Sequence, residues 1–144
     1  MNPVSVAAAD AIVSAINAAT WALAVQAARA YTPGVPAGTP SDDILAAVLP
    51  FADERELDTR ETSAADATIA IGLSRAVANP DDVAAVDAIS GVFEDIRRSL
   101  EGEQFGILYV VETSRNPLID FELLRTSSHV YATLNLSLVA EGAA

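Results

Sequence analysis

The chain has 144 residues, of which 51% are hydrophobic and 19% charged, and these proportions are typical of one folded domain. Eight arginines, no lysine and 20 acidic residues give a net charge of −12. This balance argues against binding to nucleic acid or to an anionic membrane surface, because both use clustered Lys and Arg. The lack of cysteine excludes disulfides and thiolate catalysis, and a single histidine excludes a multi-histidine metal site.

The first 40 residues predict a helix, a strand and a loop. Residues 4–18 have apolar side chains at helical spacing, and Ser5 is the expected N-cap. From Trp21 to Tyr31 apolar residues recur at every second position, which predicts a strand. Residues 32–40 contain three prolines and two glycines and predict a loop. The apolar stretch at 18–28 is too short to cross a bilayer, so we expect no membrane-spanning segment.

The next segment predicts a long hairpin. Two short apolar runs, 44–51 and 68–74, flank a polar connection at 54–66. Residues 41–66 hold eight acids and two arginines, so −6 of the net charge lies there. The tip is either a solvated loop with ion pairs of about 0–1 kcal/mol each, or an arm that docks on a neighbouring chain. Its charged candidates for contact are Glu54, Arg55, Glu56, Asp58, Arg60 and Glu61.

A second helix is expected after Asn79, with Pro80 at its first position and Asp81 and Asp82 facing the positive end of the helix dipole. Its apolar stripe continues to residue 100, and Gly102 follows the last turn. Residues 105–112 predict a strand, and 113–125 predict a loop or a short helical turn.

Residues 129–139 alternate strictly between apolar and polar side chains and predict a strand with one buried face. The polar face holds Tyr131, Thr133 and Asn135, and it is either plain solvent surface or the wall of an oligomer's cavity. The element order is α-β-β-β-α-β-β, with no internal repeat. We therefore expect a single α+β domain over residues 1–144. It would be two-layered, a mostly antiparallel sheet of four to five strands covered on one face by two helices, with a long hairpin arm.

No arrangement of residues in the sequence predicts catalysis. His129 follows two serines, but a histidine on the polar face of a strand is more often a surface residue than a catalytic base. The acidic pairs at 42–43, 53–54 and 81–82 lack the alternating ligand spacing of a calcium-binding loop. We expect no enzyme activity, no cofactor and no metal ion.

The succession of segments resembles small neck and tail-terminator proteins of long-tailed bacteriophages and related tail-like particles, over nearly the whole chain. The segments are ADAIVSAIN, WALAVQAARAYTPGVP, ILAAVLPF, DATIAIGLSR, DAISGVFEDIRRSL, ETSRNPLIDFELL and HVYATLNLSLV. In such proteins an Asn-x-Pro-Leu or Asn-Asp-Pro-Leu and an acidic-leucine stretch precede the last strand, and Asn116-Pro117-Leu118 with 120–124 occupy that place here. The chain departs from the pattern where acids replace part of the arm's basic residues, and in its Ala/Gly-rich loop at 33–39.

The resemblance implies a structural, non-enzymatic virion protein of the neck or tail end, assembled in the host cytoplasm. Such proteins form a ring, usually of six copies, that halts growth of the tail tube and offers a docking surface to the head. Its partners would be further copies of itself, the tail tube protein and head–tail connector proteins, while DNA passes through without specific binding. An acidic lumen would suit that passage.

The implied contact residues lie in the arm, at Asn116 and Pro117, and at Tyr131, Thr133 and Asn135 of the last strand. Two other functions stay open. One is a head-completion adaptor or stopper that binds the portal, and the other is a small binding module with no viral link.

Overall fold

A computed structural model describes residues 4–31, 43–58, 62–105, 108–115 and 119–140. Its helices and strands are, in chain order, α1 (Val4–Ala18), β1 (Val25–Arg29), β2 (Ile44–Asp58), β3 (Thr62–Ala76), α2 (Val83–Leu100), β4 (Gln104–Phe105), β5 (Leu108–Arg115), α3 (Phe121–Ser127) and β6 (His129–Ala140). None of the helices in these ranges is long and apolar enough to cross a membrane.

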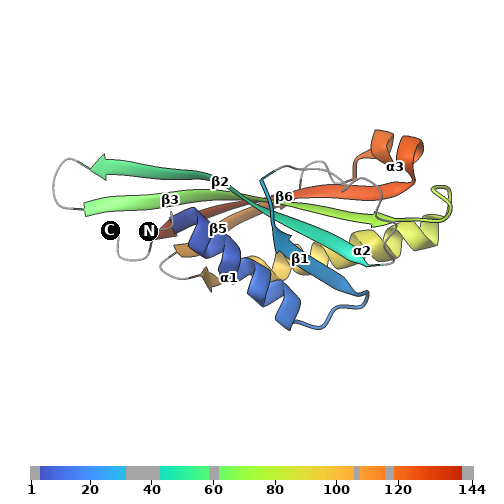
Figure 1. Ribbon diagram of the computed structural model, residues 1–144, viewed down its shortest axis with the longest axis horizontal. Coiled ribbons are helices and arrows are strands. Elements are labelled where there is room, and N and C mark those ends of the chain that lie inside the picture. Colours follow the sequence, from blue (N-terminus) through green and yellow to red (C-terminus); the bar gives the residue numbers. More distant parts are fainter. Residues whose placement is uncertain (1–3, 32–42, 59–61, 106–107, 116–118, 141–144) are drawn as a thin grey trace.

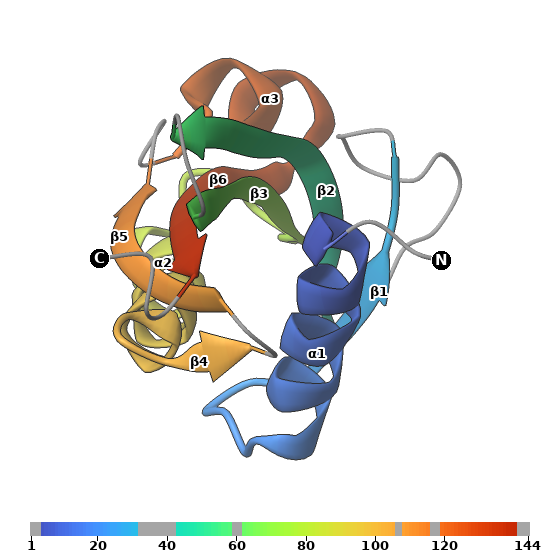
Figure 2. The ribbon, with the colours of Figure 1, turned by 90° about the vertical axis from the view of Figure 1, so that its left-hand side faces the viewer.

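The strands form one curled sheet in the order β1-β2-β3-β6-β5-β4. Strands β1 and β2 are parallel, and all other neighbours are antiparallel. Figure 2 shows α1 and α2 on one side of the curled sheet and α3 on the other. The expected α+β class is confirmed. The expected four to five strands are corrected to six and the two helices to three, counted over the described residues.

The hydrophobic core lies between α1, α2 and one face of the sheet, called here the inner face. The long apolar alternation of β6 fills this face, and its even-numbered side chains from Val130 to Leu138 are all buried. Ile69, Ile71 and Leu73 of β3 lie beside them, and Ile12 of α1 and Phe93 of α2 are fully buried against the same cluster. The period-two pattern of the strands and the helical stripes therefore meet in one core.

The predicted helix over 4–18 is confirmed with the same bounds, but it starts at Val4, so Ser5 is not its N-cap. The strand expected from Trp21 to Tyr31 is shortened to Val25–Arg29. One reason is that the Trp21 indole N–H donates to the carbonyl oxygen of Ile16, at 3.0 Å. This bond satisfies a carbonyl in the last turn of α1 and keeps Trp21 beside the helix rather than in the sheet.

Strands β2 and β3 are longer than predicted, because the polar connection at 54–66 continues their ladder. The pairs run from Leu45–Ser74 to Asp58–Thr62, with a register shift between Pro50 and Ala52. Pro50 lacks an N–H group, and it stands where the ladder shifts register. Figure 1 shows the paired far ends of β2 and β3 extending beyond the other described elements.

Helix α2 begins at Val83 rather than at Pro80, and its N-cap is Asp82, whose carboxylate accepts from the N–H of Ala85 at 3.2 Å. Gly102 follows its last turn with φ +81, as a residue without a Cβ can. The strand expected at 105–112 is two strands, β4 and β5. Residues 113–125, expected as a loop or a short helical turn, hold the end of β5 and the start of the short helix α3, which Asp120 caps by accepting from the Leu123 N–H at 3.0 Å.

Candidate interaction surface

The face of the sheet opposite α1 and α2 is called here the outer face. Tyr131, Thr133 and Asn135 of β6 alternate with the buried residues of that strand, so all three project onto the outer face. The structure thus brings together these three of the contact residues that the sequence analysis singled out. They line a hollow of about 380 Å³ with Tyr31, Leu49, Pro50, Ala70 and Gly72.

Gly72 makes room for the ring of Tyr131. A Cβ atom at position 72 would lie only 2.9 Å from the Tyr131 hydroxyl oxygen and 3.5 Å from the carbon that bears it. In the β3–β6 ladder Gly72 pairs with Thr133 and Ser74 pairs with Tyr131, so the ring leans diagonally across to the glycine. A glycine in a strand interior often marks such a close approach.

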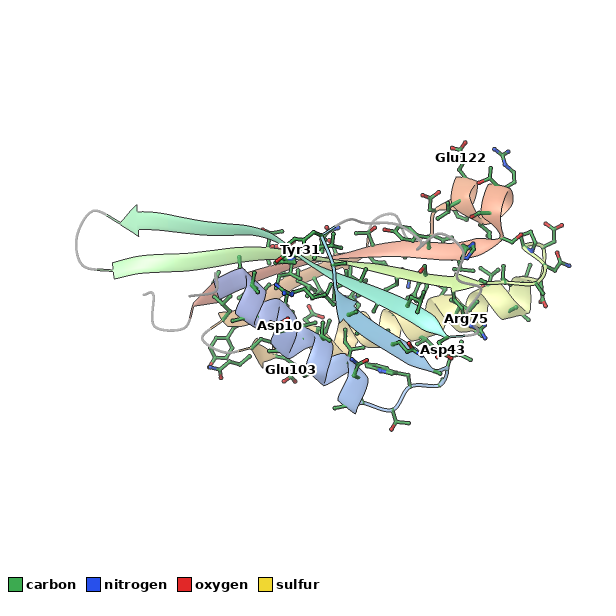
Figure 3. All side chains as sticks on the ribbon, in the orientation of Figure 1. Asp10, Tyr31, Asp43, Arg75, Glu103 and Glu122 are labelled. Atoms are coloured by element: carbon green, nitrogen blue, oxygen red, sulfur yellow. The ribbon has the colours of Figure 1, made fainter. Side chains whose placement is uncertain are left out.

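The other side of the hollow is formed by Tyr31, whose side chain is 69% exposed. Arg29 holds this ring: its Nη1 donates to the Tyr31 hydroxyl at 2.9 Å, and its guanidinium carbon lies 5.5 Å from the ring centroid. The Nε of Arg29 in turn lies 3.2 Å from Oδ1 of Asp10 on α1. Tyr31 is therefore an exposed aromatic ring with a tethered position (Figure 3).

Small side chains continue the outer face from Gly72 towards β1. A second hollow of about 230 Å³ is lined by alanines of β1 and β2 and by Gln26, Leu45, Gly72 and Ser74. The first hollow combines hydroxyl, amide and aromatic groups with aliphatic ones, whereas small apolar groups line most of the second. Such a surface can stack on a partner and exchange hydrogen bonds with it.

The remaining contact candidates lie elsewhere. Glu54, Arg55, Glu56 and Asp58 are on β2, in the far part of the hairpin with β3. Arg60, Glu61, Asn116 and Pro117 lie outside the described residues. These four charged residues of β2 lie nearer the hairpin end of the strand than Leu49 and Pro50, the residues of β2 that line the outer-face hollow.

The far part of the hairpin, from Arg55–Ala65 to Asp58–Thr62, is called here the arm ribbon. The β3–β6 ladder ends at Asp66–Val139, and the β1–β2 ladder ends at Arg29–Val48. Within the described part of the chain the arm ribbon therefore consists of two strands that pair only with each other. An isolated two-stranded ribbon is marginally stable in water.

The inner face holds a polar network that the sequence analysis missed. Arg97 of α2 donates from Nε to both carboxylate oxygens of Glu94, at 2.7 and 2.9 Å, and from Nη1 to the Thr113 hydroxyl at 2.8 Å. Arg115 of β5 donates to the carbonyl and hydroxyl oxygens of Ser90. The Glu94–Arg97 spacing was readable as a helical ion pair, whereas the links to β5 depend on tertiary packing.

These contacts shift the pKa values of the groups involved. The hydrogen bond from Arg97 holds the pKa of Glu94 below its ordinary value of 4.5, and the same bond raises the pKa of Arg97. Burial lowers the pKa of Arg115. All three groups keep their charge near neutral pH, so the network is a structural link between α2 and β5.

His129 and the acidic residues are the side chains that could form a catalytic or metal site. The Nδ1 of His129 lies 2.8 Å from the carbonyl oxygen of Ser127, and the Ser127 hydroxyl donates to Leu123 inside α3. The hydroxyl and the ring therefore do not form a nucleophile–base pair. The described ranges contain no group of three or more His, Cys, Asp or Glu residues able to hold a metal ion.

The comparisons with known proteins add no relative to this geometry. A scan against protein-family models found no match, and a search of curated proteins found no matching sequence.

Proposed function

We propose that this chain is a structural subunit of a bacteriophage neck, a tail terminator whose copies form a ring that caps the tail tube and joins it to the head. The observation that carries the proposal is the arm ribbon. Its two strands leave the sheet and pair only with each other over the described residues. A ribbon of this kind gains stability when it contacts another chain, so the fold favours an assembling protein.

The outer face supports the same function. It presents the tethered ring of Tyr31 and the polar groups of Tyr131, Thr133 and Asn135 around one hollow. Uncharged hydroxyl, amide and aromatic groups are typical of surfaces that bury against a protein partner. In the proposed ring, this face and the arm ribbon would serve different neighbours, because they lie apart in the chain.

Two of the eight arginines have carboxylate partners, which supports a ring through which DNA passes without being held. Arg29 contacts Asp10 at 3.2 Å, and Arg97 contacts Glu94 at 2.7 Å and Glu101 at 3.6 Å. Arginines paired in this way are less available to phosphates, and the net charge of −12 repels them. A duplex would therefore slide past such a surface.

Two measurements test the proposal. Light scattering after size exclusion, with and without the tail tube protein, should show a closed oligomer. A chain that stays monomeric at every concentration under both conditions would contradict a ring. Deleting the gene should then give tails of uncontrolled length. Normal tails on filled heads that leak DNA would instead indicate a stopper, and intact particles would favour a non-viral binding module.

A further inference from the structure

The two edges of the sheet differ in how they are closed. On β1, the side-chain amide of Asn17 bonds to both backbone groups of Ala27: its Nδ2 donates to the Ala27 carbonyl at 3.0 Å, and its Oδ1 accepts from the Ala27 N–H at 2.8 Å. Ala24 and Ala30 bond inward to β2, so Ala27 faces the outer edge. Asn17 thus occupies the place that an added strand would take.

The β5 edge is covered over only half its length. Strand β4 pairs with Leu108 and Tyr109, and Val110 exchanges backbone bonds with Gly102 and Glu103, at 3.0 and 2.9 Å. No other described strand continues along β5 beyond Val110. The exposed part begins with Val111, an apolar side chain that is 55% accessible.

The ladder shows which backbone groups of β5 face outward. The Tyr131 carbonyl accepts from Asp120 on the β5 side of β6, and the Ser128 carbonyl accepts from Val77 on the β3 side. The backbone N–H and C=O groups of the odd-numbered residues of β6 therefore point towards β5. Because Glu112 pairs with Ser137 and Ser114 with Asn135, the N–H and C=O of Thr113 between them point away from the sheet.

We propose that the β5 edge from Val111 to Ser114 accepts residues 54–57 of β2, that is Glu54 and the β2 strand of the arm ribbon, from a second copy of this chain, antiparallel, with Thr113 opposite Arg55. The inference rests on the proposed function and names the contact between copies. A ring needs a donor that differs from the acceptor, since pairing of β5 with β5 would close at two copies. Asn17 occupies the middle of the β1 edge at Ala27, whereas the strands of the arm ribbon pair only with each other over the described residues, so the arm ribbon is the donor in this proposal.

The register follows from side chains and backbone together. With Thr113 opposite Arg55, position 57, a leucine, lies opposite the exposed Val111, and position 53, an aspartate, lies opposite Arg115. Glu56 then faces Glu112, which is one unfavourable pair. A shift of the arm ribbon by two residues in one direction places Arg55 opposite Arg115. A shift in the other direction places Glu54 opposite Glu112, so each shift creates a pair of like charges. The chosen register is therefore the best of the three.

The test uses a proline at an outward N–H. Thr113→Pro removes the donor that faces the second copy but no ladder bond to β6. It also removes the hydroxyl that Arg97 contacts, and Thr113→Val is the matched control, because it loses the same hydroxyl and keeps the N–H. We expect Thr113→Pro to raise the concentration for half-assembly by about tenfold or more, and Thr113→Val by about twofold or less, in light scattering. Equal assembly of the two variants would overturn the proposal.

A second test identifies the occupant and uses the lack of cysteine in the chain. Ser114→Cys and Glu54→Cys, purified separately, lie opposite each other in the proposed register and should form a mixed disulfide when oxidised together. A disulfide dimer of Ser114→Cys alone would show β5 paired with β5, and no disulfide would exclude the arm ribbon; either result overturns the inference. If wild type never assembles, the proposed function fails instead, whereas assembly that Thr113→Pro leaves intact removes only this contact.

Discussion

The same two strands, β2 and β3, behave differently in the two halves of their length. Near Val48 and Ile71 they have neighbouring strands on both sides and helices over the inner face, and these side chains are fully buried. In the arm ribbon they pair only with each other among the described residues. The ladder runs through both halves, with a register shift between Pro50 and Ala52. What changes is whether other described strands pair with the two.

The difference is that buried side chains stabilise the body of the sheet, whereas for the arm ribbon the structure describes the backbone pairing of its two strands. The sequence changes at the same place: β3 reads Ile69, Ile71 and Leu73 in the body, while residues 53–58 hold four acids and an arginine. An apolar ribbon outside the body would expose strand edges prone to aggregation. A charged ribbon stays in solution until a specific partner binds.

The largest expected effect comes from emptying the core of the body. Phe93 of α2 is fully buried, and Phe93→Ala should lower the free energy of unfolding by about 3–5 kcal/mol. The matched change in the arm ribbon, Leu57→Ala, should lower the free energy of unfolding of the monomer by less than about 0.5 kcal/mol. Urea denaturation followed by circular dichroism measures both. Similar losses in the two variants would show that the arm ribbon is part of the core.

The next effect probes the outer face. Gly72→Ala should destabilise the chain by about 1 kcal/mol, because the new methyl group meets the Tyr131 hydroxyl and forces the ring to move. In a Tyr131→Phe background the same change should cost clearly less, since the oxygen at 2.9 Å is absent. A double-mutant cycle in urea measures this coupling. A coupling energy of zero would mean that the two residues do not touch.

A change of similar or smaller size is expected at the start of α2, which belongs to the body. Asp82→Ala removes the carboxylate that accepts from the Ala85 N–H and should cost about 1 kcal/mol. Asp82→Ser keeps an acceptor at the N-cap and should retain most of the stability. Thermal unfolding compares the two, and an equal loss would show that the side-chain bond is not what stabilises this end of the helix.

The pH dependence of the link between α2 and β5 should be weaker still. Arg97 lowers the pKa of Glu94, so the charged carboxylate stabilises the fold above the ordinary value of 4.5, and that stability is lost as the pH falls through the lower folded value. The contribution should be below about 1 kcal/mol, because the pair is partly exposed. Unfolding of wild type and Glu94→Gln between pH 7 and pH 3 should converge at the acid end. If the two stability curves stay parallel, the Glu94–Arg97 pair does not contribute to the pH dependence of stability.

The smallest effect on monomer stability should follow removal of the arm ribbon itself. Replacing residues 55–65 by Asn-Gly joins the pair Glu54–Asp66 through a two-residue turn. The free energy of unfolding of the monomer should change by less than about 1 kcal/mol, whereas light scattering should show that the oligomer is lost. If the shortened chain still assembles, the oligomer forms without the arm ribbon, and the proposed role of the arm ribbon in assembly is contradicted.

Local sequence signals explain the parts of the fold that were predicted well. The helix over 4–18 and the strand at the C-terminal end follow from periodicity, because apolar side chains at helical or alternating spacing can be buried on one side only. The projection of Tyr131, Thr133 and Asn135 from one face was readable for the same reason. The other residues of their hollow were not readable, since Pro50 reaches it from β2 and Tyr31 from the segment after β1.

Other features arise only when distant segments meet. The parallel pairing of β1 with β2, the bond of Arg97 to Thr113 and the Asn17 amide at Ala27 join residues that no local pattern relates. The charged residues 54–58 were predicted to belong to a polar connection, because their composition is unfavourable for a buried strand. They extend β2 because the ladder started in the body continues outward.

The sequence alone therefore determined the class of the fold, the two main helices, the apolar face of β6 and the acidic character of the chain. Only the tertiary structure decided the strand order, the length of the arm ribbon and the closing of one edge of the sheet but not the whole of the other. The physical reason is the separation in sequence between the residues that determine each feature. Burial periodicity is encoded within a few neighbouring residues, whereas the state of a strand edge depends on which distant segment supplies its hydrogen bonds.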